Sequence, residues 1–319
     1  MTETHSLRAV MPYDAPSSVM EIIDRADRSV ISISQFREGN TVEFMQALAE
    51  SEVLLHVLEP VSVDVMHHAS RLRLVHKIGV GLDAIDLDYA KQRGIAVCNM
   101  PGTNTPAVAE LALTLMLACL RRIVPITNAV SQGGGWPARI ETLGRLGEIA
   151  GRTVGLVGYG AVAQHLAKAL LAMGAKVVAY DPFVSSANIP LLELDTLVER
   201  SDIISLHIPL TRETTNLFNR SRLSRMKRGS ILINTARGPL IDEFALEEEL
   251  RVGAIAAAGL DVTAVEPPSS EHPLRSLENV VMTPHVAWLT DETWTRSIAV
   301  IVENCRRLKA GFPLLHRVA

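Results

Sequence analysis

Short runs of β-branched and aliphatic residues alternate with segments of helical periodicity along the first hundred residues. The runs LRAVM, SVISI, EVLLHV, LRLVHKIG and IAVCNM favour strands, and apolar residues recur at helical spacing in the segments between them. Strand and helix in repeated alternation predict a parallel sheet with helices on its faces. We therefore expect residues 1–100 to form a domain of their own.

The pattern changes after the first hundred residues. A long apolar helix is expected to run to Leu120, and Pro106 fits near its first position. Residues 131–151 are rich in turn-forming residues and predict connecting loops. From Arg152 strands and helices alternate again, which predicts a second parallel sheet. A long amphipathic helix that ends at Gly311 completes the chain.

Composition narrows the class of protein. The chain has 319 residues, enough for about two domains, and 48% of them are hydrophobic while only 4% are aromatic. A mean hydropathy of +0.20 excludes a disordered or collagen-like chain, and the aliphatic composition fits buried parallel strands. The 31 basic and 35 acidic residues give a formal charge of −4, so a nucleic-acid partner is not expected.

The cysteines and the apolar runs bear on the compartment. Cys98, Cys119 and Cys305 lie far apart and form no CxxC or Cys/His cluster, which predicts neither a disulfide framework nor a bound metal. The first residues lack the basic start and the long apolar run of a secretory signal. The longest apolar stretch, residues 111–120, is too short to span a bilayer. We therefore expect a cytoplasmic protein with no membrane partner.

A glycine motif stands where a strand of the second block meets a helix. Gly158 and Gly160 belong to the sequence GYGAVA, in which Ala161 and Val162 precede Ala163 at the place of a third glycine. Gly158 would form a tight turn, and Gly160 would let the amides at the start of the helix approach a pyrophosphate. In this context the motif predicts a dinucleotide site, although an ordinary turn between a strand and a helix also uses glycine.

Asp181 ends the next strand of this block. An acidic side chain at that place accepts hydrogen bonds from the adenine-ribose hydroxyls and repels the 2′-phosphate of NADP. Because no arginine follows it closely, the sequence favours NAD as the cofactor, with NADP as the alternative.

Polar residues also follow the remaining strands of the block. They are His207, Thr235 with Ala236 and Arg237, Asp261, and His285. The carboxyl ends of parallel strands meet at one edge of a sheet, where ligands bind in α/β folds, so we expect these residues to line one site. Each of them has a structural alternative, and the residues by themselves leave His207 and His285 as rival general acids.

Five segments between residues 72 and 290 carry a resemblance. They read KIGVGLDAIDLDYAKQRGIAVCNMPGTNTPAVAE, LVGYGAVAQHLAKALLAMGAKVVAYDP, SLHIPLTRETTNLFN, MKRGSILINTARGPLIDEFAL with GLDVTAVEPP, and TPHVAWLT. In this order they resemble the D-isomer-specific 2-hydroxyacid dehydrogenases, which include phosphoglycerate dehydrogenase, hydroxypyruvate reductase and formate dehydrogenase. The resemblance implies two doubly wound α/β domains with parallel sheets and an active-site cleft between them.

The resemblance also implies roles for individual residues. Arg237 would hold the substrate carboxylate through its planar guanidinium, and His285 would be the general acid and base. Glu266 would pair with His285 and favour its imidazolium form. By the same resemblance, the cofactor would be lined by His207, Pro209, Thr235, Ala236 and Asp261.

The domain organisation follows from the resemblance as well. Residues 1–100 and 288–319 would form a discontinuous substrate-binding domain, with an NAD-binding domain inserted as residues 101–287, whereas the sequence alone favours two consecutive domains. The amides of Val80 and Gly81 would help to hold the substrate carboxylate, with a simple glycine turn as the alternative.

Two positions depart from familiar members of the family. Phosphoglycerate dehydrogenases carry an Arg-Ser pair after the third strand, where this chain reads Leu55-His56-Val57-Leu58, which argues against a phosphorylated substrate. His56 would be either a pocket residue or a structural one. Trp288 stands where many members have glycine, and it would either narrow the pocket towards small oxo acids or pack in the domain hinge.

We therefore expect an NAD-dependent reductase of small unphosphorylated 2-oxo acids such as glyoxylate or hydroxypyruvate, acting on D-2-hydroxy acids in reverse. A phosphoglycerate dehydrogenase is one alternative, and an NAD(H)-sensing interaction protein of the same fold, similar to a transcriptional corepressor, is another. The resemblance also implies a homodimer built around the helix from Ala107 to Leu120, unless that helix is entirely intrachain core.

Overall fold

The structure is a computed structural model that describes residues 5–39, 41–131 and 146–319. The chain divides into two compact units: unit 1 comprises Met1–Asn104 and Trp288–Ala319, and unit 2 comprises Thr105–Ala287. The sequence and the resemblance predict these divisions after residues 100 and 287. Both ends of the chain contribute to unit 1, and unit 2 is a continuous insertion.

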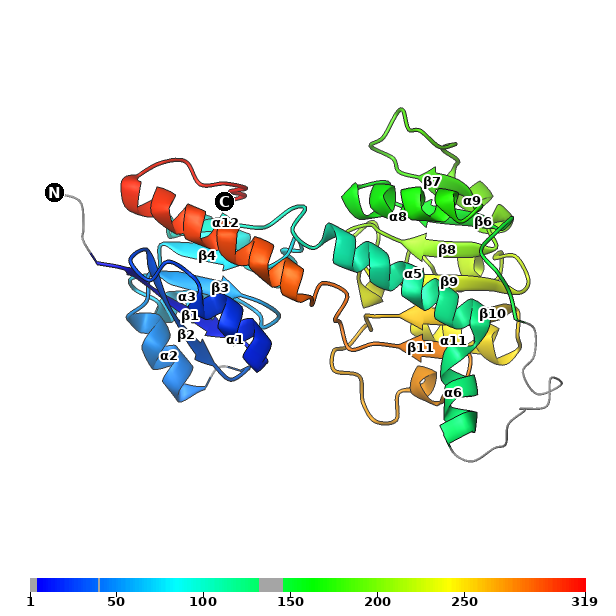
Figure 1. The fold of residues 1–319 in the computed structure, drawn as a ribbon, viewed down its shortest axis with the longest axis horizontal. Coiled ribbons are helices and arrows are strands. Elements are labelled where there is room, and N and C mark those ends of the chain that lie inside the picture. Colours follow the sequence, from blue (N-terminus) through cyan, green and yellow to red (C-terminus); the bar gives the residue numbers. More distant parts are fainter. Residues whose placement is uncertain (1–4, 40, 132–145) are drawn as a thin grey trace. The chain divides into compact units, whose positions relative to one another are not determined.

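Unit 1 is built on a parallel sheet with the strand order β2-β1-β3-β4-β5 among its described residues. Strands and helices alternate along the chain, which confirms the prediction from the residue pattern (Figure 1). The elements are β1 Leu7–Pro12, α1 Ser17–Asp24, β2 Ile31–Phe36, α2 Val42–Ala49, β3 Val53–His56, α3 Val63–His68, β4 Leu74–Lys77, α4 Leu87–Gln92, β5 Ala96–Cys98 and α12 Asp291–Ala310.

Capping residues fix where the helices of unit 1 begin and end. The side chains of Thr41, Ser62 and Asp86 each accept a hydrogen bond from a backbone amide in the first turn of α2, α3 and α4. Such a cap stabilises its helix by about 1 kcal/mol. Thr290 caps α12 in the same way, and Gly311 ends it with a left-handed φ of 72°. Because α12 packs on α1, the two ends of the chain are joined in one unit.

Unit 2 is built on a second parallel sheet, with the strand order β11-β10-β9-β8-β6-β7 among its described residues (Figure 1). The elements are α5 Thr105–Arg121, α6 Ile123–Ser131, β6 Thr153–Val157, α8 Ala161–Ala172, β7 Lys176–Tyr180, α9 Leu194–Arg200, β8 Ile203–Leu206, α10 Arg220–Leu223, β9 Ser230–Asn234, η1 Gly238–Leu240, α11 Glu243–Arg251, β10 Ile255–Leu260, η2 Pro273–Ser276 and β11 Val280–Met282. Strand order reverses at β6, which pairs with β7 on one side and β8 on the other. Ligands of open α/β sheets bind at such a point, outside the carboxyl ends of the strands.

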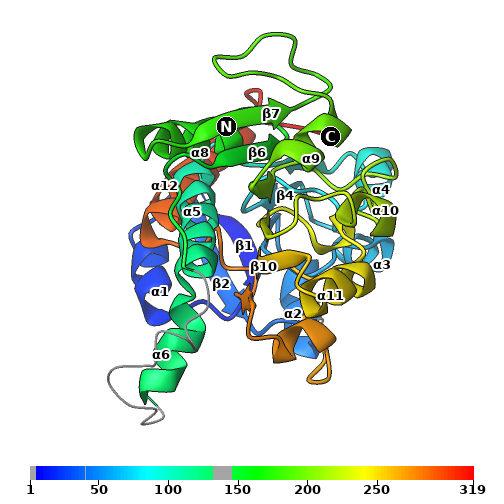
Figure 2. The same cartoon turned by 90° about the vertical axis from the view of Figure 1, so that its right-hand side faces the viewer.

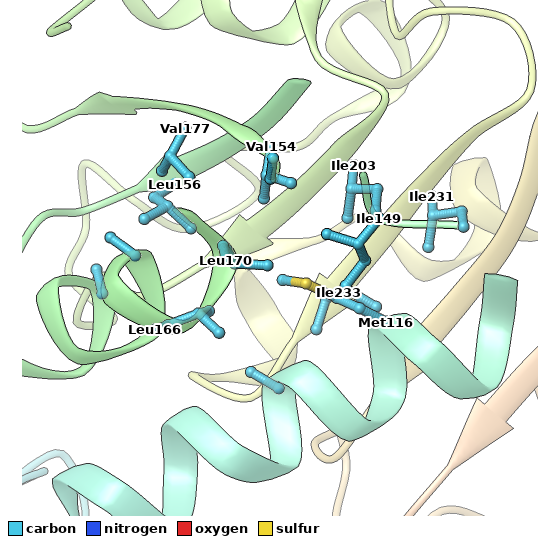
Figure 3. Close-up of a cluster of buried hydrophobic side chains, with 14 of the residues drawn as sticks. Met116, Ile149, Val154, Leu156, Leu166, Leu170, Val177, Ile203, Ile231 and Ile233 are labelled. Atoms are coloured by element: carbon cyan, nitrogen blue, oxygen red, sulfur yellow. The ribbon is translucent and has the colours of Figure 1, made fainter. Parts of the chain in front are cut away.

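A hydrophobic cluster packs α5 and α8 onto the sheet of unit 2. Figure 3 shows Met116 of α5 and Leu166 and Leu170 of α8 gathered with strand residues such as Leu156 and Ile233. All five side chains are at most 1% exposed. Truncating one buried leucine of this kind to alanine costs about 2–5 kcal/mol, so the cluster holds α8 firmly against β6. The turn between β6 and α8 is thereby fixed in place.

Helix α5 accounts for the apolar run in the sequence. It is 17 residues long, and its buried residues include Ala112, Leu115 and Cys119, which belong to the core of unit 2. One face of α5 therefore packs in the core of unit 2, which explains part of its apolar composition. In the part of the chain that the structure describes, no helix is both long and apolar enough to cross a membrane.

Helix α6 was not predicted from the residue pattern. It follows α5 after Arg122, which has a left-handed φ of 49°, and none of its side chains is buried. Figure 2 shows α6 extending beyond the end of α5. The loops predicted over residues 131–151 fall mostly on residues 132–145, which lie outside the described residues.

Candidate active site

The turn between β6 and α8 requires glycine for two reasons. Gly158 has a left-handed φ of 90°, and a Cβ atom there would lie 2.5 Å from the carbonyl oxygen of His207. Gly160 precedes α8 as its N-cap residue, and a Cβ atom there would meet no other atom within 4 Å. The turn therefore packs tightly on the side of β8 and is open at Gly160. The amides of Ala161 and Val162 belong to the first turn of α8 and have no acceptor within the helix.

Asp181 reaches this turn from the end of β7. Its Oδ2 accepts a hydrogen bond from the Tyr159 amide at 2.8 Å, and its Oδ1 accepts one from the Phe183 amide at 2.9 Å. Each carboxylate oxygen keeps a second lone pair for a further donor. The structure thus brings Asp181 beside the glycine turn, where the fingerprint places the acceptor of the ribose hydroxyls.

The ends of β8 and β9 contribute buried polar atoms. Nε2 of His207 and Oγ1 of Thr235 are buried and have no hydrogen-bond partner among the described residues. Burial lowers the pKa of His207 to about 4, so its imidazole is neutral near pH 7. Pro209, two residues further along, is exposed. Buried polar atoms without partners are uncommon, and the Thr235 hydroxyl is therefore a candidate ligand-binding group.

These features fit a dinucleotide. The open face at Gly160 leaves room for a pyrophosphate next to the unpaired first-turn amides of α8, and the positive end of the helix dipole favours its charge. Asp181 can accept from ribose hydroxyls, and Thr235 has an unpaired hydroxyl at the same sheet edge. Among the described residues, no group of three or more His, Cys, Asp or Glu side chains is arranged to hold a metal ion.

Arg237 follows β9 in a turn that neighbouring residues shape. Nδ2 of Asn234 donates to the Arg237 carbonyl at 2.8 Å, and Oδ1 of Asn234 accepts from the Ala236 amide at 3.0 Å. At Gly238 the chain passes directly against the segment that follows β10. A Cβ atom on Gly238 would lie only 1.9 Å from the carbonyl carbon of Thr263. The turn of Arg237 and the segment after β10 are therefore in backbone contact.

Glu266 and His285 form a hydrogen-bonded pair. Nδ1 of His285 lies 2.6 Å from Oε2 of Glu266, and because a carboxylate only accepts, Nδ1 is the donor. Oε1 of Glu266 accepts from the Thr263 amide at 3.1 Å. The imidazole side chain is 23% exposed. Since Nδ1 is engaged, Nε2 is the nitrogen that can exchange a proton with a ligand.

The charge of Glu266 is set by its neighbours. Burial raises the pKa of this carboxyl, but the hydrogen bond and charge of His285, the Thr263 amide and the charge of Arg237 together outweigh burial and lower it. Glu266 is therefore ionised at neutral pH. Arg237 precedes Gly238, which lies against Thr263, and the Thr263 amide donates to Glu266, so the turn of Arg237 and the acid–base pair meet at the same short segment.

Asp261 holds the segment that carries His285. Its side chain is 1% exposed, and its carboxylate accepts from the Thr283 hydroxyl at 2.6 Å and from the Val286 and Ala287 amides at 2.9 Å each. Burial raises the pKa of Asp261, although these hydrogen bonds and the charge of His285 oppose that rise. The resemblance implies a contact of Asp261 with the cofactor; in the structure both carboxylate oxygens are engaged by the His285 segment.

The remaining predicted residues lie in unit 1. Val80 and Gly81 follow β4; Val80 is 46% exposed, and its carbonyl accepts from Nδ2 of Asn99 at 3.0 Å. Their role as carboxylate donors stays a prediction. His56 ends β3 and is buried, with neither ring nitrogen partnered among the described residues. Burial, followed by the charge of Lys77, lowers the pKa of His56 to about 3, so the imidazole is neutral.

Trp288 belongs to an aromatic cluster of unit 1. Its ring centroid lies 6.0 Å from that of Tyr13 and 5.5 Å from that of Trp294, and the side chain is 8% exposed. Tyr13 and Trp294 also stack, at 5.9 Å. Trp288 is therefore a packed residue of unit 1, and its predicted effect on the substrate pocket stays a prediction.

A second histidine–carboxylate pair was missed by the sequence analysis. Nε2 of His272 lies 3.1 Å from Oε2 of Glu243, and Oε1 of Glu243 accepts from the Ala264 amide at 2.8 Å. No pattern in the sequence joins these three residues, because their contacts depend on how α11, η2 and the segment after β10 fold together. The one available signal is that Glu243 begins a helix, where an acidic side chain is favoured.

Known proteins similar to this chain agree with the geometry. The family model described as D-isomer specific 2-hydroxyacid dehydrogenase, NAD binding domain, matches residues 113–287, more than half of the chain. The hydroxypyruvate reductase of Thermotoga maritima is 44% identical over 267 residues, which cover 82% of this chain and 86% of that protein. The D-3-phosphoglycerate dehydrogenase of Mycobacterium tuberculosis is 42% identical over 314 residues, which cover 96% of this chain.

The relatives differ in how much of their own length matches this chain. The matched region covers only 58% of the M. tuberculosis protein, so the chain spans little more than half the length of that dehydrogenase. Among solved structures, the TT0316 protein from Thermus thermophilus superposes with a TM-score of 0.88 at 36% identity, covering 98% of this chain and 100% of that one. The similarity therefore extends over both units and confirms the α/β fold with two parallel sheets.

Proposed function

Because the chain belongs to the D-isomer specific 2-hydroxyacid dehydrogenase family, we propose that it reduces small unphosphorylated 2-oxo acids with NADH and oxidises D-2-hydroxy acids in reverse. The observation that carries this proposal is the grouping of Arg237, Glu266 and His285, with 2.6 Å between the imidazole and the carboxylate. The group offers a cation for a carboxylate and a proton donor for an oxo oxygen. Reduction of a 2-oxo acid needs both from the protein.

Arg237 is the proposed anchor of the substrate carboxylate. A guanidinium can donate two parallel hydrogen bonds to a carboxylate, which fixes orientation as well as position. Its Nη1 donates to the carbonyl of Ala236 at 2.7 Å, and this contact orients the planar group. Anchoring the carboxylate holds the neighbouring oxo carbon in one orientation relative to His285.

His285 is the proposed general acid and base. When bound, NADH supplies the hydride that reaches the oxo carbon. Nε2 of His285 donates its proton to the oxo oxygen, so that the oxo acid gains one hydride and one proton and becomes a 2-hydroxy acid. In the reverse direction Nε2 accepts the hydroxyl proton. Glu266 holds Nδ1 and stabilises the imidazolium, whereas His207, neutral and buried at Nε2, is unsuited to this role.

Unit 2 is the proposed NAD-binding domain, and unit 1 the proposed substrate-binding domain. The carboxylate of Asp181 supports NAD over NADP, because it would repel a 2′-phosphate. The test compares kcat/KM for NADH and NADPH with one oxo acid. We expect a preference for NADH of at least about tenfold, the factor that corresponds to roughly 1.4 kcal/mol. A preference for NADPH would contradict the assignment.

The proposed substrates are glyoxylate-like and hydroxypyruvate-like acids. The names of two relatives, hydroxypyruvate reductase and glyoxylate reductase, support this class. His56, buried and neutral, offers no cation for a phosphate. Loss of NADH absorbance should be measured with glyoxylate, hydroxypyruvate, pyruvate, branched oxo acids and 3-phosphohydroxypyruvate. The highest kcat/KM for the phosphorylated acid would indicate a phosphoglycerate dehydrogenase instead. No turnover on any acid, together with tight NADH binding, would favour an NAD(H)-sensing role.

A cytoplasmic homodimer is also part of the proposal. The side chains of Ile123, Val124 and Val130 on α6 are 40–50% exposed, and contiguous exposed apolar residues mark interaction surfaces. Continuity of α6 with α5 supports an interface along these two helices. Light scattering of the purified protein should give twice the chain mass of 34.7 kDa. A mass of one chain at micromolar concentration would contradict the dimer.

A further inference from the structure

The pair formed by Glu243 and His272 is built like a functional pair but is shielded from solvent. The two side chains are 13% and 15% exposed, respectively. Because the carboxylate only accepts, Nε2 of His272 carries the proton that it donates to Glu243. Nδ1 of His272 is buried and has no partner among the described residues. A ring held in this way has no nitrogen available to a substrate.

Glu243 uses its other oxygen to hold the backbone of the active-site segment. Oε1 accepts from the Ala264 amide at 2.8 Å, and the preceding amide, that of Thr263, donates to Glu266. Two consecutive amides of one segment are therefore held by two carboxylates. One of these carboxylates belongs to the pair with His272, and the other belongs to the pair with His285.

The same segment also touches the turn of Arg237. A Cβ atom on Gly238 would lie 1.9 Å from the Thr263 carbonyl carbon and 2.4 Å from the Ala264 nitrogen. A displacement of residues 263–264 would therefore change the position of Glu266 and press on the turn that carries Arg237. The position of Arg237 and that of the pair of Glu266 and His285 therefore both depend on the backbone of residues 263–264.

We propose that Glu243 and His272 are positioning residues that hold residues 263–264, and through them the pair of Glu266 and His285, in the geometry for proton transfer. This inference rests on the proposed function, because it concerns the histidine that acts as general acid there. The pair exchanges no proton with the substrate. His272 fixes the carboxylate of Glu243, and Glu243 fixes the amide of Ala264.

Misplacement of a reacting group by about 1 Å costs ~10²-fold in rate, so the loss of such a support has a measurable kinetic effect. Glu243→Ala should lower kcat by ~10-fold to ~10²-fold. The KM and the dissociation constant for NADH should stay within about twofold, because the glycine turn and Asp181 are elsewhere. The solvent isotope effect on kcat should rise, since proton transfer becomes slower relative to the other steps.

Conservative variants separate positioning from general stability. Glu243→Gln keeps an oxygen for the Ala264 amide, and we expect it to restore most of the activity that Glu243→Ala loses. His272→Ala leaves Glu243 in place but unsupported, and its kcat should fall less than that of Glu243→Ala. The matched control is Glu248→Gln on the same helix; Glu248 pairs with Arg220 at the surface and should tolerate the change.

A second readout does not depend on turnover. The short hydrogen bond between His285 and Glu266 should give a strongly downfield Nδ1 proton resonance in the imidazole-labelled protein. This resonance should shift or broaden in Glu243→Ala and stay unchanged in Glu248→Gln. Unaltered resonance and kcat in Glu243→Ala would overturn the proposal, as would a parallel loss of kcat and NADH binding. If the unmodified protein turns over no oxo acid, the proposed function fails, and the resonance still tests the positioning.

Discussion

Two imidazole–carboxylate pairs of unit 2 bind consecutive backbone amides, those of residues 263 and 264. The two pairs use the same chemical groups in opposite ways. Glu266 takes Nδ1 of His285 and leaves Nε2 available on a ring that is 23% exposed. Glu243 takes Nε2 of His272 and leaves Nδ1 buried without a described partner. The choice of nitrogen and the burial of the other one decide whether the ring can exchange protons with a ligand.

The backbone conformation also differs between the two histidines. His285 has a left-handed φ of 53°, a conformation that is uncommon for a residue other than glycine, and Asp261 holds the amides that follow it. His272 leads into the short helix η2 and carries no such conformation. An unusual backbone that is held by buried hydrogen bonds is typical of positions where geometry serves a function.

The largest effect should follow from removing the ring that keeps a free nitrogen. His285→Gln should lower kcat by ~10² or more, because the variant lacks the imidazole that donates the proton to the oxo oxygen. NADH binding, measured by fluorescence, should stay near that of the unmodified protein. His207→Gln provides the comparison: kcat should stay within about threefold while the KM for NADH rises. Near-normal turnover of His285→Gln would remove this histidine from the mechanism.

The next effect concerns the carboxylate of each pair. Glu266→Gln should lower kcat by ~10-fold to ~10²-fold, because a neutral amide no longer stabilises the imidazolium and can orient either its oxygen or its nitrogen towards Nδ1. Glu243→Gln should lower it only a few-fold, since an amide oxygen still accepts from Ala264. Steady-state kinetics with one oxo acid at saturating NADH decide the order. Equal losses in the two variants would erase the distinction between the pairs.

The strands and the residues at their ends could be predicted because short apolar runs in the sequence are enough to indicate buried strands. Alternating apolar runs predict the two parallel sheets, and topology then brings His207, Thr235, Arg237, Asp261 and His285 to one edge. The residue patterns do not indicate what each side chain does at that edge. For Asp261 only the resemblance implies a contact with the cofactor, and that role stays a prediction; what the sequence does not indicate is that both of its oxygens also hold the His285 segment.

Contacts between segments that lie far apart in the chain were beyond prediction. The approach of Gly238 to Thr263 and the contact of Glu243 with Ala264 depend on how η1 and the start of α11 pack on the irregular segment after β10. Helix α6 was missed for another reason: none of its side chains is buried, so burial within the unit does not explain its apolar composition. The periodicity of apolar residues predicts helices that bury one face, and α6 buries none of its side chains.

The contact at Gly238 joins the turn of Arg237 to residues 263–264, whose amides bind the carboxylates of both pairs, and it should be sensitive to one added methyl group. Gly238→Ala would place Cβ 1.9 Å from a backbone carbon, which cannot rotate away, so the segment must shift. We expect the free energy of unfolding in urea to fall by about 1–3 kcal/mol, with a lower kcat. Gly253→Ala is the control, because Gly253 has φ of 69° and open space around its Cβ position. It should lose stability through backbone strain alone and keep its kcat.

The smallest effect should appear in the pH dependence of stability. The pKa of Glu266 is lowered in the folded protein from its ordinary value of 4.5, despite burial, by His285, Thr263 and Arg237. The stabilisation from this carboxylate is therefore complete above pH 4.5 and is lost as the pH falls through the lower folded value. Between pH 7 and pH 3, Tm should fall further in the unmodified protein than in Glu266→Gln.

Salt separates this term from surface electrostatics. Glu248 also has a lowered pKa, through its hydrogen bond with Arg220, but both side chains are exposed, so 0.5 M salt should screen their interaction. The Tm difference between the unmodified protein and Glu266→Gln should persist in salt, because Glu266 is partly buried beside His285. The same Tm measurement on Glu248→Gln provides the comparison. If 0.5 M salt removes the Tm difference of Glu266→Gln as fully as that of Glu248→Gln, the Glu266 carboxylate is solvated like a surface group, and its proposed interaction with His285 is contradicted.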